Sequence, residues 1–294
     1  MKQLNILLSG YTGYVGQLIL SYLRSNGHSI FTLGKALDAD VRLDLTDLSS
    51  FKPDRSLFSK LDFIIHAAAA NEVICKLDPE YAQLLTINAT QQLYGLSQAF
   101  SAQFIYISTA HVFGPYQGQV KESSTPSPVS TYGMLHHRAE QYLLDNQLSS
   151  VLRLGNLLAA PASWNTFNRW TLAPFDLTRQ ALLSGSIQLN TSGQQRRNWT
   201  MAETLFRSVD MLLYNNRVRV VHATGNSLSV LQLAGRIADS IKVLYGQEIT
   251  ITAASPEPVL RTLMPTDIGS HYNTSLPIVS TNTLVEGVSR HLVP

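Results

Sequence analysis

The sequence predicts an α/β fold with a doubly wound parallel sheet and a smaller C-terminal lobe. Short apolar runs alternate with amphipathic stretches through the first half of the 294 residues, as in strands joined by crossover helices. A glycine-rich turn follows the first apolar run, and parallel sheets bind ligands at such strand ends. After Gly155 the chain becomes rich in Trp, Phe, Pro and Asn and loses clear periodicity, which indicates a second unit.

Apolar spacing places the individual elements. The expected strands are Asn5–Ser9, Ser29–Leu33, Phe63–His66, Phe104–Ser108, Ser150–Leu154 and Val218–His222. The expected helices are Tyr14–Ser25, Pro79–Phe100, Tyr132–Asn146 and Ser229–Tyr245. The last fifty residues are expected to be rich in loops, because they hold Pro256, Pro258, Pro265 and Pro277. We expect a dinucleotide-binding unit over residues 1–155, to which 196–226 return, and a substrate-binding lobe over 156–195 and 227–294.

Composition excludes several classes of protein. The formal charge is +2 without a basic cluster, so neither nucleic acid nor an anionic membrane surface is an expected partner. Cys75 is the single cysteine, which excludes an intrachain disulfide framework and a multi-cysteine metal site, and we expect no metal. The sequence lacks a charged leader and an apolar run long enough to cross a bilayer, so we expect a cytoplasmic protein.

The glycine turn is the stretch around which the other motifs are arranged. It reads Gly10-Tyr11-Thr12-Gly13-Tyr14-Val15-Gly16, between an expected buried strand and an expected helix. Free backbone N–H groups and the helix dipole make such a turn an anion site, and the pyrophosphate of a dinucleotide is its usual ligand in a Rossmann-type fold. The spacing is G-x-x-G-x-x-G rather than G-x-G-x-x-G, and a purely structural turn is the alternative.

Residues after the next strands bear on the choice of cofactor. The second strand ends at Leu33-Gly34-Lys35, with no carboxylate to bind the ribose hydroxyls of NAD. Lys35 could pair with a 2′-phosphate, so NADP(H) is favoured over NAD(H), although Lys35 could also be an ordinary surface lysine. Asp44 is a candidate acceptor for the adenine amino group, with an acidic turn or a helix cap as the alternative. Ala67, Ala68 and Ala69 are small enough to let the backbone approach the cofactor.

Two hydroxyl groups and a phenol are the candidates for chemistry. Ser108 and Thr109 end an expected strand, and Tyr132 begins an expected helix. A hydroxyl and a phenol brought together can polarise a carbonyl and relay a proton to or from an alcohol. Each residue alone could be structural, but their order after the glycine turn makes the combination specific.

These motifs together resemble the extended short-chain dehydrogenase/reductase superfamily, the NAD-dependent epimerases, dehydratases and reductases of nucleotide sugars. The segments Leu33-Gly34-Lys35, Asp44-Leu45 and Tyr106–Gly114 are most similar to dTDP-4-dehydrorhamnose reductases, which often use NADPH. The resemblance covers nearly the whole chain. It implies that Thr109 binds the substrate oxygen and that Tyr132 is the acid or base. It also implies cofactor contacts at Leu45 and Asn88, substrate contacts at Asn156 and Arg197, and a homodimer through the helices Pro79–Phe100 and Tyr132–Asn146. Arg197 suits a diphosphate, with a structural arginine as the alternative.

The chain departs from this superfamily at two positions. The lysine expected four residues after Tyr132 is His136. A neutral imidazole can bind the nicotinamide ribose, but it supplies no permanent charge to lower the pKa of the tyrosine. Ala110 stands where dehydratases carry an acid, which argues against a sugar 4,6-dehydratase. The next residue, His111, is a candidate proton donor near the substrate, with a packed or surface histidine as the alternative.

Two functions remain open at this point. The first is an NAD(P)-dependent oxidoreductase or epimerase that acts on a nucleotide sugar or a related carbonyl compound, with reduction favoured over oxidation. The second is a cofactor-binding regulatory or scaffold subunit with impaired catalysis, for which the regulatory subunit of methionine adenosyltransferase, which resembles the same reductases, is a precedent.

Overall fold

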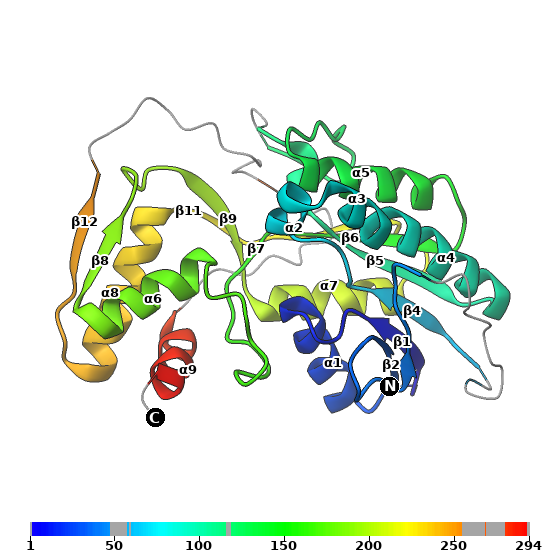
Figure 1. Cartoon of the computed structure of the whole chain (residues 1–294), viewed down its shortest axis with the longest axis horizontal. Helices are drawn as coiled ribbons and strands as arrows, with labels where there is room; N and C mark the ends of the chain where they lie inside the picture. Colours follow the sequence, from blue (N-terminus) through cyan, green and yellow to red (C-terminus); the bar gives the residue numbers. More distant parts are fainter. Residues whose placement is uncertain are drawn as a thin grey trace.

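A seven-stranded sheet forms the larger part of the computed structural model, which describes residues 2–47, 60–115, 119–254 and 280–292 together with Phe58 and Ile268. All of its strand pairs are parallel, in the order β10-β6-β5-β4-β1-β2-β3 (Figure 1). The strands are β1 (Asn5–Ser9), β2 (Ser29–Gly34), β3 (Val41–Arg42), β4 (Phe63–His66), β5 (Gln103–Thr109), β6 (Ser149–Leu154) and β10 (Val220–Ala223). The order reverses beside β1, so the predicted doubly wound, Rossmann-type sheet is confirmed.

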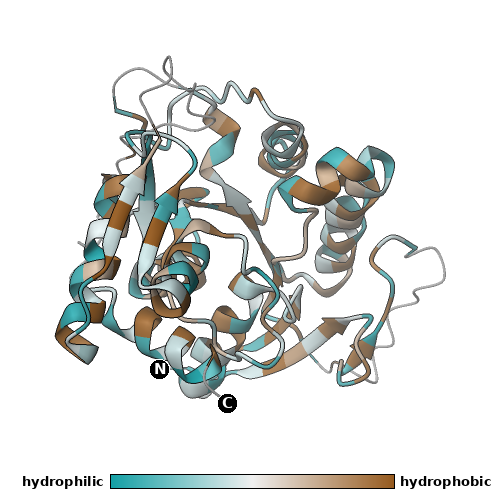
Figure 2. Cartoon of the chain, turned by 60° about the vertical axis from the view of Figure 1, so that its left-hand side comes forward, coloured by the Kyte–Doolittle hydropathy of each residue, from teal (hydrophilic) through white to brown (hydrophobic). Residues whose placement is uncertain are grey.

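Helices cover both faces of this sheet, because alternate side chains of each buried strand point to opposite sides. Helices α1 (Tyr14–Ser25) and α7 (Ala202–Tyr214) pack on the face that includes Ile6 and Leu8. Helices α4 (Ala89–Phe100) and α5 (Thr131–Leu144) pack on the face that includes Leu7. Figure 2 shows the apolar and polar stripes of the helices.

The expected helix Pro79–Phe100 is helical throughout, but one turn of it is a π turn. It consists of α3 (Pro79–Gln83), the π turn (Leu84–Asn88) and α4, preceded by α2 (Glu72–Leu77). Thr86 within the π turn accepts a hydrogen bond from Ala70 N at 3.1 Å, so this turn is held to the segment that follows β4. A π turn typically occurs as a single turn inside an α-helix, so apolar spacing predicts the helix but not the turn.

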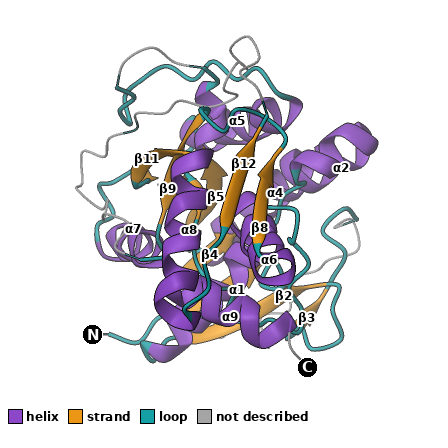
Figure 3. Cartoon of the chain, turned by 90° about the vertical axis from the view of Figure 1, so that its left-hand side faces the viewer, coloured by secondary structure: helices purple, strands orange, loops and turns teal. Residues whose placement is uncertain are grey.

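A smaller part lies beside the parallel sheet, and β7 (Asn156–Leu157) and β9 (Arg196–Thr200) lie between the two (Figure 1). Figure 3 views the molecule from the side of the smaller part. These strands join β11 (Asn226–Ser229) in a three-stranded sheet, while β8 (Ser186–Leu189) pairs with β12 (Thr250–Ala253). Helices α6 (Ala173–Ser184), α8 (Val230–Tyr245) and α9 (Asn282–Leu292) enclose a separate core.

Helix α6 and strand β8 show that the segment 156–193 contains regular structure despite its poor periodicity. In the tail, β12 and α9 are regular, while residues 255–267 and 269–279 lie outside the described residues. Aromatic residues around α6 pack on one another: Phe167 and Phe175 lie 4.3 Å apart between ring centroids. Such clustering obscures the periodic spacing from which helices are predicted. The prolines of the tail, Pro256, Pro258, Pro265 and Pro277, lie outside the described residues.

The described residues contain no helix that is both long and apolar enough to cross a membrane. Within the same residues, no group of three or more His, Cys, Asp or Glu side chains could hold a metal ion. The division into a cofactor unit and a substrate lobe stays a prediction, as does the homodimer.

Candidate active site

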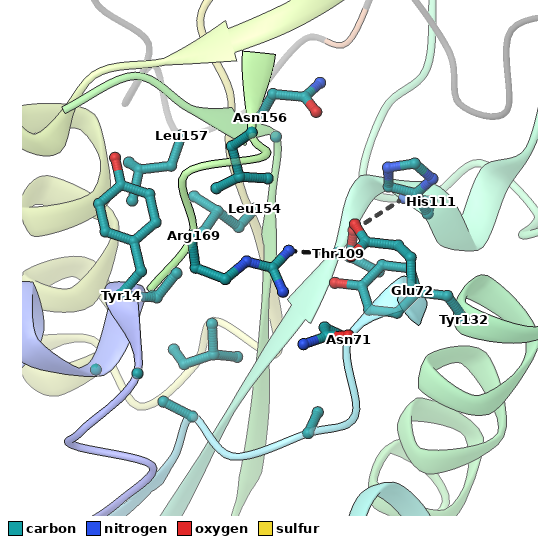
Figure 4. A pocket seen from close by; sticks show the side chains of 18 of the residues that line it. Tyr14, Asn71, Glu72, Thr109, His111, Tyr132, Leu154, Asn156, Leu157 and Arg169 are labelled. Atoms are coloured by element: carbon teal, nitrogen blue, oxygen red, sulfur yellow. Dashed lines mark hydrogen bonds and ion pairs between the residues drawn. The ribbon is translucent and has the colours of Figure 1, made fainter. Parts of the chain in front are cut away.

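A cavity of about 430 Å³ opens at the carboxyl ends of the central strands, between the parallel sheet and the smaller part (Figure 4). The predicted site residues that line it are Thr12, Gly13, Tyr14, Val15, Gly16, Ala67, Ala69, Thr109, His111, Tyr132, His136, Asn156 and Arg197. The predicted residues that do not line it are Gly10, Tyr11, Lys35, Asp44, Leu45, Ala68 and Asn88. Segments far apart in the sequence therefore converge on one site.

The glycine turn is as tight as its spacing predicts. Gly10 has a φ of +75°, and a Cβ at this residue would lie 2.5 Å from the backbone of Ala67. A Cβ on Gly16 would lie 2.0 Å from the carbonyl oxygen of Gly10, so a side chain at either position would force the turn open. Gly13 caps α1 without a side-chain hydrogen bond, and the first turn of α1 contains no acidic residue. The backbone donors at this helix end are therefore left for an anion.

The two tyrosines of the turn use their side chains elsewhere. The Tyr11 hydroxyl donates to Asp38 Oδ1 at 2.6 Å. The Tyr14 hydroxyl donates to the carbonyl oxygen of Ala159 at 2.5 Å, which joins the turn to the smaller part. Any contact of these two tyrosines with a cofactor would therefore involve the backbone or the faces of the rings, because both hydroxyl groups already have partners.

Lys35, the predicted ligand of a 2′-phosphate, and Asp44, the predicted acceptor for the adenine amino group, contact each other. Lys35 Nζ lies 2.7 Å from Asp44 Oδ2, and both side chains are partly exposed. The hydrogen bond with Asp44 raises the pKa of Lys35. Burial opposes ionisation of Asp44, but its hydrogen bonds with Lys35 and Thr46 lower its pKa to about 2. A 2′-phosphate at Lys35 must therefore compete with a carboxylate.

Three other predicted cofactor residues lie outside the cavity for identifiable reasons. Leu45 and Ala68 pack in the hydrophobic cluster beneath α4 and α5. Asn88 ends the π turn, and its side chain is half-buried. By contrast, the Ala67 backbone N donates to the Ser9 carbonyl oxygen at 3.1 Å, which holds this small-residue segment against the end of β1.

Thr109 and Tyr132 meet at the end of β5 (Figure 4). The Thr109 side chain accepts from His111 N at 3.2 Å and lies beside the Tyr132 phenol in the cavity. Burial and the Glu72 carboxylate raise the pKa of Tyr132 above its ordinary value, although Thr109 and Arg169 oppose the shift. Burial lowers the pKa of His111, whose ring lies 5.5 Å from that of Tyr132. Near neutral pH, Tyr132 therefore holds its proton.

His136 lies one helical turn beyond Tyr132 on α5, and the two ring centroids are 4.6 Å apart. Its Nδ1 lies 2.8 Å from the Tyr106 hydroxyl, whereas its buried Nε2 has no hydrogen-bond partner among the described residues. Burial, and then His111 and His66, lower the pKa of His136 to about 3. The ring is therefore neutral at physiological pH.

The tautomer of His136 sets the role of its second nitrogen. The neutral ring carries a hydrogen on one nitrogen and accepts at the other. Where Tyr106 accepts from the Nδ1–H, Nε2 is an acceptor, and where Tyr106 donates to Nδ1, the Nε2–H is a donor.

Ser108, the other hydroxyl of the predicted pair, forms a structural hydrogen bond. It donates to the buried Glu140 Oε1 at 2.5 Å. Arg153 Nη2 lies 2.7 Å from Glu140 Oε2, and both side chains are almost fully buried. Tyr132, His136 and Glu140 occupy one side of α5, and His136 and Glu140 are each bonded to a residue of β5.

The opposite wall belongs to the smaller part. Asn156 Nδ2 donates to the Asn198 carbonyl oxygen at 3.0 Å. Burial lowers the pKa of Arg197, while the Glu72 carboxylate opposes this shift. Arg197 forms no ion pair with any residue in the described part of the chain.

Glu72 and Arg169 also line the cavity, and the sequence analysis did not identify them. Arg169 Nη2 lies 3.2 Å from Glu72 Oε2 across the cavity (Figure 4). No motif surrounds either residue. The only signal in the sequence is that Glu72 follows the alanine segment after β4, at a strand end where ligands bind.

The residues present fit a nicotinamide dinucleotide. The unpaired helix end at Gly13 suits a pyrophosphate, and the close approach at Gly10 keeps the turn narrow. The unpartnered Nε2 of His136 suits a ribose hydroxyl.

Comparisons with known proteins agree with this arrangement. Residues 6–222 match the model of the NAD dependent epimerase/dehydratase family. Methionine adenosyltransferase 2 subunit beta of Xenopus tropicalis is 30% identical over 152 residues, which are 50% of this chain and 45% of that protein. The dTDP-4-dehydrorhamnose reductase of Salmonella typhimurium is 32% identical over 148 residues, 49% of this chain and 48% of the reductase. The chain thus spans about half the length of these curated relatives.

A solved structure extends the likeness in fold to nearly the whole chain. The dTDP-4-dehydrorhamnose reductase of Bacillus anthracis in complex with NADP has a TM-score of 0.76 and 18% sequence identity, with 99% of each chain covered. At that identity the likeness concerns the fold.

Proposed function

The chain belongs to the NAD dependent epimerase/dehydratase family, and we propose that it is an NADP(H)-dependent oxidoreductase or epimerase acting on a nucleotide-linked sugar. The observation that carries the proposal is that Thr109 and Tyr132 lie together in the cavity that the glycine turn also lines. A bound nicotinamide cofactor supplies hydride chemistry at such a site.

Thr109 and Tyr132 would handle the substrate oxygen. A substrate carbonyl that accepts hydrogen bonds from both hydroxyls is polarised and held in one orientation. The raised pKa of Tyr132 suits a group that keeps its proton until negative charge develops on the substrate oxygen. Reduction of a carbonyl is therefore the favoured direction, with Tyr132 as the proton donor.

His136 would act as a neutral ligand of the cofactor ribose. Its Nε2 has no hydrogen-bond partner among the described residues, and its pKa of about 3 keeps a positive charge away from Tyr132. The deprotonated tyrosine that alcohol oxidation requires therefore receives little electrostatic support.

Arg197 and Asn156 would bind the remainder of the substrate. The mostly buried guanidinium of Arg197 faces the cavity without an ion-pair partner in the described residues. A planar guanidinium of this kind binds two oxygens of a diphosphate. A homodimer through α4 and α5 and a cytoplasmic location belong to the same proposal and rest on family resemblance alone.

One observation favours a regulatory or scaffold subunit as a second candidate. The buried His136 cannot supply the charge that would activate Tyr132 as a base. Methionine adenosyltransferase 2 subunit beta is among the relatives that match about half of this chain. A protein of this second kind binds NADPH without turning over a substrate.

The test measures NADPH binding and the reduction of a dTDP-4-keto sugar by the wild type and by the His136→Lys variant. We expect binding by both proteins and a detectable rate that increases in the variant. Turnover by the wild type would refute the regulatory candidate. NADPH binding without turnover by either protein would refute the enzyme, and no NADPH binding would refute both.

A further inference from the structure

Glu72 and Arg169 form an ion pair in the cavity to which the proposed reaction assigns no role. Glu72 is the first residue of α2, and the Asn71 side chain fixes the backbone there by accepting from Val73 N and Ile74 N at 3.0 Å each. Arg169 comes from the loop before α6, where its carbonyl oxygen accepts from Leu172 N at 3.1 Å. The two charges thus project from opposite walls and meet at 3.2 Å.

The pair lies close to the phenol that would handle the reacting oxygen. The Glu72 carboxylate raises the pKa of Tyr132, and the Arg169 guanidinium lowers it. The same carboxylate acts on His111 and on Arg197. In Figure 4, Arg169 extends across the cavity toward Thr109, Glu72 and Tyr132. A sugar ring whose carbonyl reaches Thr109 and Tyr132 must therefore contact this pair.

The two charges suit a neutral ring that carries hydroxyl groups. A carboxylate accepts hydrogen bonds from hydroxyls and a guanidinium donates to hydroxyl oxygens, so such a ring can bind both without breaking the ion pair. A carboxylate on the ring would meet Glu72 as a like charge. It would also compete with Glu72 for Arg169, so that two carboxylates would share one guanidinium.

We propose that Glu72 and Arg169 together select a neutral sugar ring and reject a uronate ring at the reacting end of the substrate. The inference rests on the proposed function, because it assumes that a nucleotide sugar binds in this cavity. The diphosphate does not need this pair, since Arg197 is available to it.

The experiment compares the binding of two ligands that differ only at C6 of the sugar. UDP-glucose and UDP-glucuronic acid, and the corresponding dTDP sugars, are titrated into the NADP⁺-loaded protein by calorimetry. We expect the wild type to bind the glucose form about tenfold more tightly than the uronate form. Glu72→Gln removes the like charge and leaves Arg169 unpaired, so the preference should disappear or reverse. Glu248→Gln, which breaks the exposed ion pair with Lys242, is the matched control and should keep the wild-type ratio.

A second variant tests whether the ion pair selects the ligand or only holds the two walls of the cavity together. Glu72→Arg combined with Arg169→Glu restores an ion pair with the charges exchanged. If the pair only holds the two walls together, Glu72→Gln should weaken the binding of both ligands equally and lower the unfolding temperature. The charge-exchanged variant should then restore both properties. We expect instead a nearly unchanged unfolding temperature, because partly exposed pairs add little stability, and a ligand ratio that the exchange does not restore.

Three results would overturn the inference. Equal affinity of the wild type for both rings, or a preference for the uronate, would refute selection and leave the proposed function intact. An equal loss of affinity for both ligands in Glu72→Gln, with recovery in the charge-exchanged variant, would mean that the pair only holds the two walls together. If NADP⁺ binds but none of the four sugars does, both the selection and the proposed nucleotide-sugar substrate fail.

Discussion

The Nδ1 of His136 lies 2.8 Å from the Tyr106 hydroxyl, so the residue in the position of the family lysine is bonded to the centre of the sheet. This bond occupies Nδ1 and leaves Nε2 without a partner among the described residues. The lysine of the family carries a permanent charge, whereas this buried ring is neutral at physiological pH. The two side chains therefore differ in charge at the same helical position.

Restoring the lysine should lower the pKa of Tyr132. A positive charge within about 4–6 Å of the phenol favours the phenolate and typically shifts a pKa by about 1–3 units. We expect His136→Lys to move the rise in alcohol oxidation toward lower pH by a similar amount, as measured from the pH profile of kcat. His137→Lys, on the neighbouring position of α5, is the control, and an equal shift there would contradict the assignment.

Removing the phenol should abolish proton donation without affecting the cofactor. We expect Tyr132→Phe to lower kcat for keto-sugar reduction by about 10²–10⁴, the usual contribution of a positioned acid, with an unchanged Kd for NADPH. Tyr142→Phe, on the same helix but packed in the interior, should keep most of the activity. A Tyr132→Phe variant with wild-type kcat would remove Tyr132 from the mechanism.

The contact between Lys35 and Asp44 predicts two opposite effects on cofactor choice. Lys35→Asp should shift the ratio of dissociation constants from NADP(H) toward NAD(H), because a 2′-phosphate would meet a carboxylate. Asp44→Asn should shift the ratio the other way, about fivefold, because Lys35 no longer has a competing anion. Lys60→Asp breaks a similar ion pair, with Asp62, and is the control. Unchanged ratios in both test variants would mean that Lys35 does not contact the phosphate.

The buried histidines predict a loss of stability in mild acid. Burial lowers the pKa values of His66 and His136 to about 3, so between about pH 6.5 and pH 3 the unfolded chain binds protons that the native chain does not. The free energy of unfolding should therefore decrease as the pH falls below about 6.5, by up to about 1.4 kcal/mol per pH unit for each histidine.

Urea unfolding at pH 7 and pH 5 measures this effect. His66→Asn should lose less stability over that interval than the wild type, because it lacks one of the two titrating groups. A wild-type protein equally stable at both pH values would contradict neutral burial of these rings.

Substitutions in the buried Glu140–Arg153 ion pair should change the stability of the fold strongly. Glu140→Gln leaves Arg153 buried without its counter-charge and should destabilise the fold by about 3–5 kcal/mol. Replacing both residues by Met should cost less, because no uncompensated charge remains. Urea denaturation compares the variants, and a double variant less stable than Glu140→Gln would contradict this account.

The parallel sheet and much of the site could be predicted because their signals are local. The strand Asn5–Ser9 and the helix Tyr14–Ser25 have the predicted bounds, since apolar spacing and a glycine turn act over a few residues. Thr109 and Tyr132 follow elements whose ends must meet at one edge of the sheet. Their convergence therefore follows from topology.

The remaining features depend on contacts that the local sequence does not encode. Glu72 and Arg169 are 97 residues apart, and neither belongs to a motif. The Lys35–Asp44 contact had a usable signal, because opposite charges follow the ends of the neighbouring strands β2 and β3. The hydrogen bond of His136 depends on Tyr106, which lies on β5, another element of the fold.

The strand β10 has a consequence for synthesis of the chain on the ribosome. It pairs in parallel with β6, and its Val221 belongs to the same core as Ile6 and Leu8 of β1. The outer edge of the sheet therefore stays open until residue 223 has been made, when the strands of the smaller part up to β9 already exist. During that interval β6 has no partner strand at the edge of the sheet in the nascent chain. Aggregation and chaperone binding therefore compete with folding at this stage.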